Sequence, residues 1–143
     1  MSLSNVLNIM SSALTAESLR INTIASNLAN AESVSGNEKE AFHARHPVFA
    51  EVQQSISGIG KHEQPIGGVR VVDVVQSQKP LESRFDPSNP LADENGKVYQ
   101  TDVNPLEEMA DMMAASRHYQ ASIDVMNTSK NLMMQTIKAI HNL

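Results

Sequence analysis

Apolar residues recur at alternating steps of four and three along the first part of the chain. The pattern occupies Leu3, Leu7, Met10, Leu14, Glu17, Ile21, Ile24, Leu28 and Ala31, with Glu17 as its polar break. A repeat of about 3.5 residues predicts a helix with one apolar seam, as in coiled coils. At ~1.5 Å per residue this helix would be about 40 Å long. The sequence therefore predicts an N-terminal axial helix within residues 1–33.

The C-terminal part repeats the same spacing. Its positions are Met109, Met112, Ser116, Tyr119, Ile123, Met126, Lys130, Met133, Ile137 and Ile140. We expect a second axial helix within residues 106–143, paired with the first as an antiparallel coiled coil. A register that sets Glu17 opposite Lys130 also sets Ala31 opposite Ser116. Each polar residue of a seam then faces either an opposite charge or a small side chain. Glu17 and Lys130 are therefore a hypothesis for a register-setting pair. Two unrelated solvated charges are the alternative.

Glycine and proline divide the chain. All six glycines and all six prolines lie between Gly36 and Pro105, whereas all eight methionines lie outside that interval. Residues 34–105 are therefore predicted to form a small β-rich middle subdomain. Strands are expected over 47–52 and 69–75, where β-branched residues gather between turn signals. The alternation slips between Val71 and Val72, which predicts a β-bulge or burial on both faces.

The predicted fold is mainly α with a small β subdomain, but its core is short of bulky side chains. Aromatic residues make up 3% of the chain. Four of the five lie in the middle, where we expect them to seed a small core; they are Phe42, Phe49, Phe85 and Tyr99. Such a subdomain would be only marginally stable alone.

Charge and hydropathy exclude several classes of function. The net charge is −5 and no cluster of Lys and Arg is present, so nucleic acid is not an expected partner. The chain has no apolar run of 18 residues, and we expect it not to be membrane-inserted. Its N-terminus lacks the basic and apolar regions of a cleaved secretion signal. It contains no cysteine, which removes disulfides and thiolate chemistry.

Residues suited to catalysis or metal binding occur only in fragments. His43 and His46 are three apart, and His62 follows, but residues three apart on a strand point to opposite faces. A metal site on these histidines is the weaker alternative to solvated loop histidines. The stretch 91–96 resembles part of a calcium loop without its first and last ligands, and 58–63 lacks the third glycine of a dinucleotide loop. We therefore expect no enzymatic activity and no cofactor.

The two seams do not contain every apolar residue of the terminal segments. Those outside the seams are Val6, Leu19, Met113, Val125, Leu132, Met134 and Leu143. Two helices packed only on each other would leave them exposed, so this surplus predicts contacts with other chains. A self-contained coiled-coil adaptor or binding module is the alternative.

Three motifs carry a resemblance to a known family. The run 25–31, ASNLANA, resembles the N-terminal signature of bacterial flagellar rod, hook and related axial proteins. Residues 116–123, SRHYQASI, followed by 126–130, MNTSK, resemble the matching C-terminal element. The middle segments 89–99, 102–104 and 108–109 resemble those of the proximal rod proteins within this family. The resemblance spans nearly the whole chain.

The resemblance implies a structural subunit of the flagellar basal body. Axial proteins of this family pair their terminal helices in an inner layer and stack helically into a drive shaft that transmits torque across the periplasm. The implied partners are other copies of the chain, other rod proteins and the flagellar type III export apparatus. The implied location is the periplasmic rod, which subunits reach without cleavage of a signal peptide.

The resemblance also selects an expected assembly interface, drawn from both seams and both signature motifs. Its residues are Leu7, Met10, Leu14, Glu17, Ile21, Ile24, Ser26, Asn27, Leu28, Asn30, Ser116, Arg117, Tyr119, Gln120, Ile123, Met126, Asn127, Lys130, Met133, Ile137 and Ile140. In the amide-rich helix end, Ser26, Asn27 and Asn30 are expected to hydrogen-bond to neighbouring subunits. An ordinary helix C-cap near Asn30 is the alternative.

Overall fold

Long helices and small antiparallel sheets make up the computed structural model, which describes residues 3–52 and 67–141. The helices are α1 (Leu3–Ala29) and α2 (Pro105–His141). The strands are β1 (Val34–Ser35), β2 (Arg45–Glu51), β3 (Val69–Gln76), β4 (Ser83–Phe85) and β5 (Lys97–Gln100). This is the mainly α fold with a small β region that the sequence predicts.

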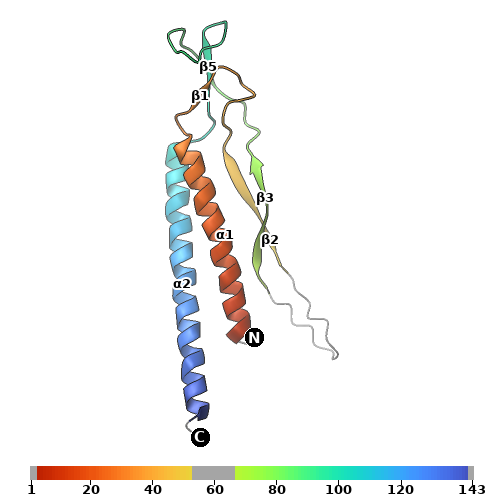
Figure 1. Cartoon of the computed structure of the whole chain (residues 1–143), viewed down its shortest axis with the longest axis vertical. Coiled ribbons are helices and arrows are strands. Elements are labelled where there is room, and N and C mark those ends of the chain that lie inside the picture. Colours follow the sequence, from red (N-terminus) through yellow and green to blue (C-terminus); the bar gives the residue numbers. More distant parts are fainter. Residues whose placement is uncertain (1–2, 53–66, 142–143) are drawn as a thin grey trace.

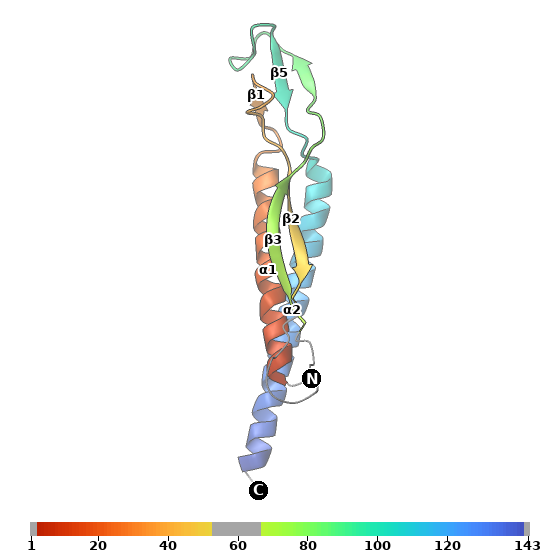
Figure 2. The ribbon, with the colours of Figure 1, turned by 90° about the vertical axis from the view of Figure 1, so that its right-hand side faces the viewer.

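The helices lie side by side and antiparallel, with α1 between α2 and the β2–β3 hairpin (Figure 1). The hairpin runs along the helices, whereas β1, β4 and β5 gather at the end where α1 stops and α2 begins (Figure 2). α2 has 37 residues and α1 has 27, and α2 continues past the N-terminal end of α1 (Figure 1). The C-terminal end of α2 therefore has no α1 residues beside it.

Local chemistry accounts for the helix start at Pro105. The side-chain oxygen of Asn104 accepts a hydrogen bond from the Leu106 amide at 3.1 Å, which is an N-cap. Proline suits the first helical position because its missing N–H would have had no helical partner. Glu107 and Glu108 in the first turn complement the positive end of the helix dipole.

The end of α1 is closed by amide side chains and tight turns. The Asn30 amide nitrogen donates to the Ser26 carbonyl at 2.8 Å, and the Asn30 backbone amide donates to the Asn27 carbonyl at 3.0 Å. Both bonds are local, so Asn30 acts here as the helix-end residue of the C-cap alternative.

The β2–β3 hairpin confirms both strands predicted in the middle of the chain. Val48 pairs with Asp73 and Phe49 pairs with Val71, so Val72 is an extra residue opposite no partner. This is the bulge predicted from the slipped alternation. Burial on both faces, the other option, is wrong, since Val72 is half exposed. Sequence reasoning missed β1, β4 and β5, which are two to four residues long.

The buried core consists mostly of small side chains. Its apolar members are Ala16, Ile24, Ala41, Ala44, Val98, Val103 and Ala115. Of the four aromatic residues expected to seed a core, Phe42 and Tyr99 are half-buried, whereas Phe49 is 40% exposed and Phe85 is 71% exposed. Sheets of two and three strands are too small to enclose a phenyl ring, so these rings lie on the surface.

Candidate assembly interface

Three polar contacts join α1 to α2 and define their register. Asn27 donates to Glu108 Oε1 at 2.9 Å, Arg20 Nη2 lies 3.6 Å from Asp111 Oδ1, and Glu17 Oε1 lies 3.4 Å from His118 Nδ1. The α1 partners descend in number as the α2 partners rise, as expected for antiparallel helices. Polar side chains therefore cross the seam at three levels.

This register overturns the predicted pairing of Glu17 with Lys130. Lys130 lies 12 residues beyond His118 on α2, which is roughly 18 Å at ~1.5 Å per residue. Glu17 is met instead by His118 and, within its own helix, by Arg20 at 4.0 Å. The two seams share one period, so they fit in several registers, and complementary charges alone selected the wrong one.

The structure predicts a distinct result for charge reversal at this site. Glu17→Lys should destabilise the chain by about 1 kcal/mol, because it places a second cation beside Arg20. Adding Lys130→Glu should restore none of that loss, since the two positions lie far apart. Urea unfolding of both single variants and the double variant measures the coupling. A recovery of more than about 0.5 kcal/mol would favour the Glu17–Lys130 register.

Within the predicted interface, the Asn27 side chain has hydrogen-bond partners for both its nitrogen and its oxygen. It is 0% exposed and lies where α1, β2 and α2 meet. Its Nδ2 donates to the Arg45 carbonyl and to Glu108 Oε1, both at 2.9 Å. Its Oδ1 accepts from the Arg45 amide, also at 2.9 Å. The hydrogen bonds of Asn27 therefore lie within the chain. Its expected contacts with neighbouring subunits stay a prediction.

Asp102 makes a second buried connection. It binds Ala44, the residue just before the Arg45 that Asn27 binds. Its Oδ1 accepts a hydrogen bond from the Ala44 amide at 2.6 Å, and its side chain is 4% exposed. The Ala44 carbonyl accepts from the Ser77 amide at 2.8 Å, which ties in the end of β3. Ala44 and Arg45 are therefore a hub, held by Asp102 and Asn27, from which the hairpin leaves the helices.

The hub sets the ionisation of Asp102. Burial alone would raise the pKa of this carboxyl group. The nearby Ser77 hydroxyl and the Ala44 amide, which donates to Oδ1, outweigh burial, so the pKa of Asp102 lies below its ordinary value. The imidazole of His43, with Nδ1 at 3.8 Å from Asp102 Oδ2, acts in the same direction. Asp102 thus stays charged while it holds the start of β2.

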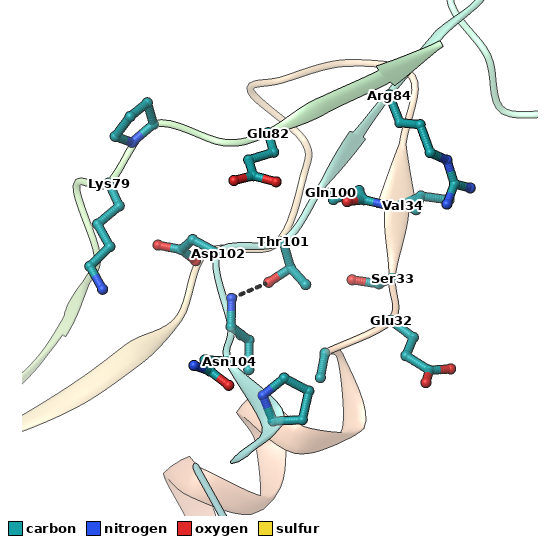
Figure 3. Close-up of a pocket in the computed structure, with 14 residues that line it drawn as sticks. Glu32, Ser33, Val34, Lys79, Glu82, Arg84, Gln100, Thr101, Asp102 and Asn104 are labelled. Atoms are coloured by element: carbon teal, nitrogen blue, oxygen red, sulfur yellow. Dashed lines mark hydrogen bonds between the residues drawn. The ribbon is translucent and has the colours of Figure 1, made fainter. Parts of the chain in front are cut away.

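A groove opens beside the hub, at the joint between the helices and the β-rich end (Figure 3). Glu32, Lys79, Glu82 and Arg84 bring charges of both signs to it. The Val103 amide donates to Thr101 Oγ1 at 3.2 Å and so closes a local turn. Some polar groups of the groove therefore stabilise the turn between β5 and α2.

The sequence fragments considered for metals have other roles in the structure. Within the described ranges, 3–52 and 67–141, no group of three or more His, Asp or Glu residues could hold a metal ion. His62 of the histidine alternative lies outside these ranges. In the calcium-like fragment, Asp93 Oδ1 accepts the Lys97 and Asn95 amides at 2.7 and 2.9 Å. The Lys97 hydrogen bond chiefly lowers the pKa of Asp93, which serves as a turn residue.

The expected interface residues divide into two groups by exposure. Leu7, Met10, Leu14, Ile21 and Leu28 of α1 are half-buried and Ile24 is buried. In α2, Tyr119, Ile123, Met126 and Met133 are half-buried. The exposed members, all in α2, are Ser116, Arg117, Gln120, Asn127, Lys130, Ile137 and Ile140. Residues of the first group pack largely against the rest of the chain, whereas those of the second group are exposed on its surface.

Most apolar residues outside the seams are exposed, as their surplus predicts, although Val6 is half-buried. The exposed ones are Leu19, Met113, Val125, Leu132 and Met134, each between 38% and 59% exposed. Leu143 lies outside the described residues. Leu106 and Met109 at the start of α2 are also exposed, at 73% and 48%. Large apolar side chains therefore stay uncovered along the length of α2, which is typical of a surface that other proteins cover.

Sequence reasoning missed the role of two carboxylates. Asp102 and Glu108 lie in segments noted for their family resemblance, yet nothing in their spacing indicates that they become buried. The available signal is their position: Glu108 lies in the first turn of a proline-started helix, and Asp102 lies three residues before that helix begins. A carboxylate near a helix start is normally explained by the helix dipole or by capping, so the sequence gives no reason to expect a tertiary contact.

No helix in the described part of the chain is long and apolar enough to cross a membrane. The long helices, the polar hub and the exposed apolar residues of α2 are typical of an elongated structural subunit. Two family models match within this framework. Flagella basal body rod protein matches residues 7–36, and the C-terminal model of flagellar basal body rod FlgEFG proteins matches residues 94–139.

Curated relatives identify the family more closely. The chain is 44% identical to the flagellar basal-body rod protein FlgC of Salmonella typhimurium over 96% of this chain and 97% of that protein. It is 44% identical to FlgC of Escherichia coli O157:H7 and 41% identical to FlgC of Buchnera aphidicola subsp. Schizaphis graminum, with the same coverage. The chain belongs to the FlgC family of flagellar basal-body rod proteins. It is a structural rod protein and not an enzyme, as predicted.

Proposed function

We propose that this chain assembles helically with other copies and with other rod proteins into the proximal part of the flagellar drive shaft, which transmits torque across the periplasm. Residues 1–33 and 106–143 are the assembling segments, paired as a coiled coil, and 34–105 form an outer subdomain. The observation that carries the proposal is the uncovered apolar surface of α2. Covering it is worth roughly 25 cal/mol per Å² of apolar surface, enough to drive association.

The polar hub supports a mechanical role. A torque-bearing subunit must move as one body, so its parts need connections that resist sliding. Asn27 joins α1 to α2 and to the start of β2, and Asp102 joins the segment before α2 to the same strand. Directional hydrogen bonds in a buried site hold one geometry better than apolar contacts do. The hub is therefore suited to keep the hairpin and the helices together under load.

We further propose that the flagellar type III export apparatus delivers the subunit. Passage as an unfolded chain requires that unfolding be easy, and the chain has few fully buried large side chains; Val98 and Asn27 are the largest among the described residues. It also contains no cysteine and hence no disulfide. A small core of this kind costs little to unfold before export. Family membership sets aside the alternative of a self-contained adaptor.

Substitution of an exposed apolar residue tests the proposed function. In a normally motile bacterium whose own FlgC has been deleted, so that it no longer swims, the unmodified chain should restore swimming. Met113→Glu should leave the isolated subunit within about 0.5 kcal/mol of its normal stability, because Met113 is 59% exposed, yet it should abolish swimming. Lys39→Glu, in an exposed turn, is the control and should swim. Normal swimming with Met113→Glu, or none with the unmodified chain, would contradict the proposal.

A further inference from the structure

Two surfaces of this chain have no partner among the residues that the structure describes. The first is the α2 extension, which we define as residues 132–140, the part of α2 beyond the start of α1 (Figure 1). With His118 opposite Glu17, the first residue of α1 lies near residue 132 of α2. The exposed fractions of Leu132, Met134, Ile137 and Ile140 are 50%, 48%, 60% and 68%. The extension carries one charge, on Lys138.

The second surface is a groove over the outer face of α1, which we call the α1 groove. The residues of α1 that line it, which we call its floor, include Thr15, Ser18 and Asn22 together with Leu14 and Leu19. Val69, Arg70 and Val71 of β3 form one wall, and Tyr119 of α2 belongs to the other. The Val69 amide donates to Ser12 Oγ at 3.2 Å, which fixes the β3 wall against α1. The groove is thus formed by three elements that hold one another in place.

The outer face of α1 is uncharged. The charged side chains of α1 are Glu17 and Arg20, and both reach across to α2. A helix that faces water normally carries charges on its outer side. Uncharged residues in that place, several of them small, favour the approach of another helix, because no charged group must lose its hydration. The composition of the floor therefore fits a helix as the occupant.

We infer that the α1 groove of one copy receives the α2 extension of another copy. The sizes agree, since residues 12–22 and 132–140 span roughly 16 and 14 Å of helix at ~1.5 Å per residue. The stripe of Ile123 and Met126, which is half-buried within the chain, continues into the extension as Met133, Ile137 and Ile140. One face of α2 would thus contact α1 of its own chain and then α1 of a second copy. The contact joins unlike surfaces and does not close on itself, so it propagates. The inference rests on the proposed rod function and names one of its contacts.

The absence of cysteine in the natural chain makes a crosslinking test direct. Two differently tagged versions, one with Thr15→Cys and one with Ile137→Cys, are produced together in a strain without its own FlgC. Isolated basal bodies are then oxidised. We expect a disulfide-linked species with both tags, at least tenfold above the control in which Lys39→Cys replaces Thr15→Cys. Because each chain carries one cysteine, the disulfide can form only between copies.

The result of the crosslinking test separates failure of the inferred contact from failure of the proposed function. A strain that swims and yields normal basal bodies, but gives no more crosslink than the control, would overturn the inference and leave the rod function intact. That result includes the case in which another rod protein fills the groove. Absence of the unmodified chain from isolated basal bodies would instead refute the proposed function and, with it, this contact.

A second variant tests the groove without crosslinking. Thr15→Trp should fill the floor and lower incorporation into basal bodies at least tenfold, whereas Lys39→Trp, in an exposed turn, should incorporate normally. Both positions are exposed in the isolated chain, so the far-ultraviolet circular dichroism of both variants should match that of the unmodified chain. Normal incorporation of Thr15→Trp would contradict the proposed contact.

Discussion

Asn27→Asp should destabilise the isolated chain by about 3–5 kcal/mol, the range seen when a buried charge loses its compensation. The substitution removes both Nδ2 hydrogen bonds, to the Arg45 carbonyl and to Glu108 Oε1. It also places two carboxylates in hydrogen-bond contact at a site where Asn27 is 0% exposed and Glu108 is 6% exposed. Urea unfolding followed by circular dichroism measures the loss.

The chain offers a matched control and a rescue for this prediction. Asn30→Asp, three residues along the same helix end, should cost less than about 1 kcal/mol, because it removes one local bond to the Ser26 carbonyl. Adding Glu108→Gln to Asn27→Asp should recover roughly half of the loss, since the new amide can donate to the new carboxylate. Equal costs at positions 27 and 30 would show that Asn27 is only part of a helix cap.

Asp102→Asn should destabilise the chain by about 2 kcal/mol at pH 7 and weaken its acid sensitivity, because charge-assisted hydrogen bonds are worth about 1.5–3 kcal/mol. The pKa of Asp102 is lowered in the folded chain, so the unfolded chain binds a proton more readily. The stability that Asp102 contributes is therefore complete above its unfolded pKa of about 3.9, and it is lost as pH falls through the folded pKa.

Unfolding free energies at pH 7, 5, 4 and 3 test this prediction. The variant should lose less stability on acidification than the unmodified chain. Some acid dependence should persist, since hydrogen bonds also lower the pKa values of Asp86 and Asp93, chiefly from Ser88 and Lys97 respectively. Asp73→Asn is the control, because Asp73 is an exposed strand residue. A parallel pH profile for Asp102→Asn and the unmodified chain would exclude Asp102 as a charged anchor of the hub.

These experiments separate two uses of polar residues at the amide-rich helix end. Asn27 connects three elements within the chain, whereas Asn30 closes the helix locally. The neighbouring Ala25 and Ala29 are exposed and small, and they remain available for close approach by another subunit. One short motif therefore combines an internal anchor, a helix end and a surface suited to packing.

Hydrophobic spacing in the sequence was sufficient to predict both helices, because a 3.5-residue seam is a local property of the chain. The bulge at Val72 was predictable for the same reason, since it appears as a slip in a two-residue alternation. The exposed Met113, Val125 and Leu132 followed from counting apolar residues that two helices cannot cover. Each of these features depends on nearby residues or on composition.

The helix register and the hub were decided only by tertiary structure. Two seams of equal period pack acceptably at several offsets, so spacing could not choose between Lys130 and His118 as the neighbour of Glu17. The offset is consistent with one set of buried bonds, those of Asn27 with Glu108 and Arg45. The partner that a buried amide finds depends on where distant segments of the chain meet, and no local pattern encodes that meeting.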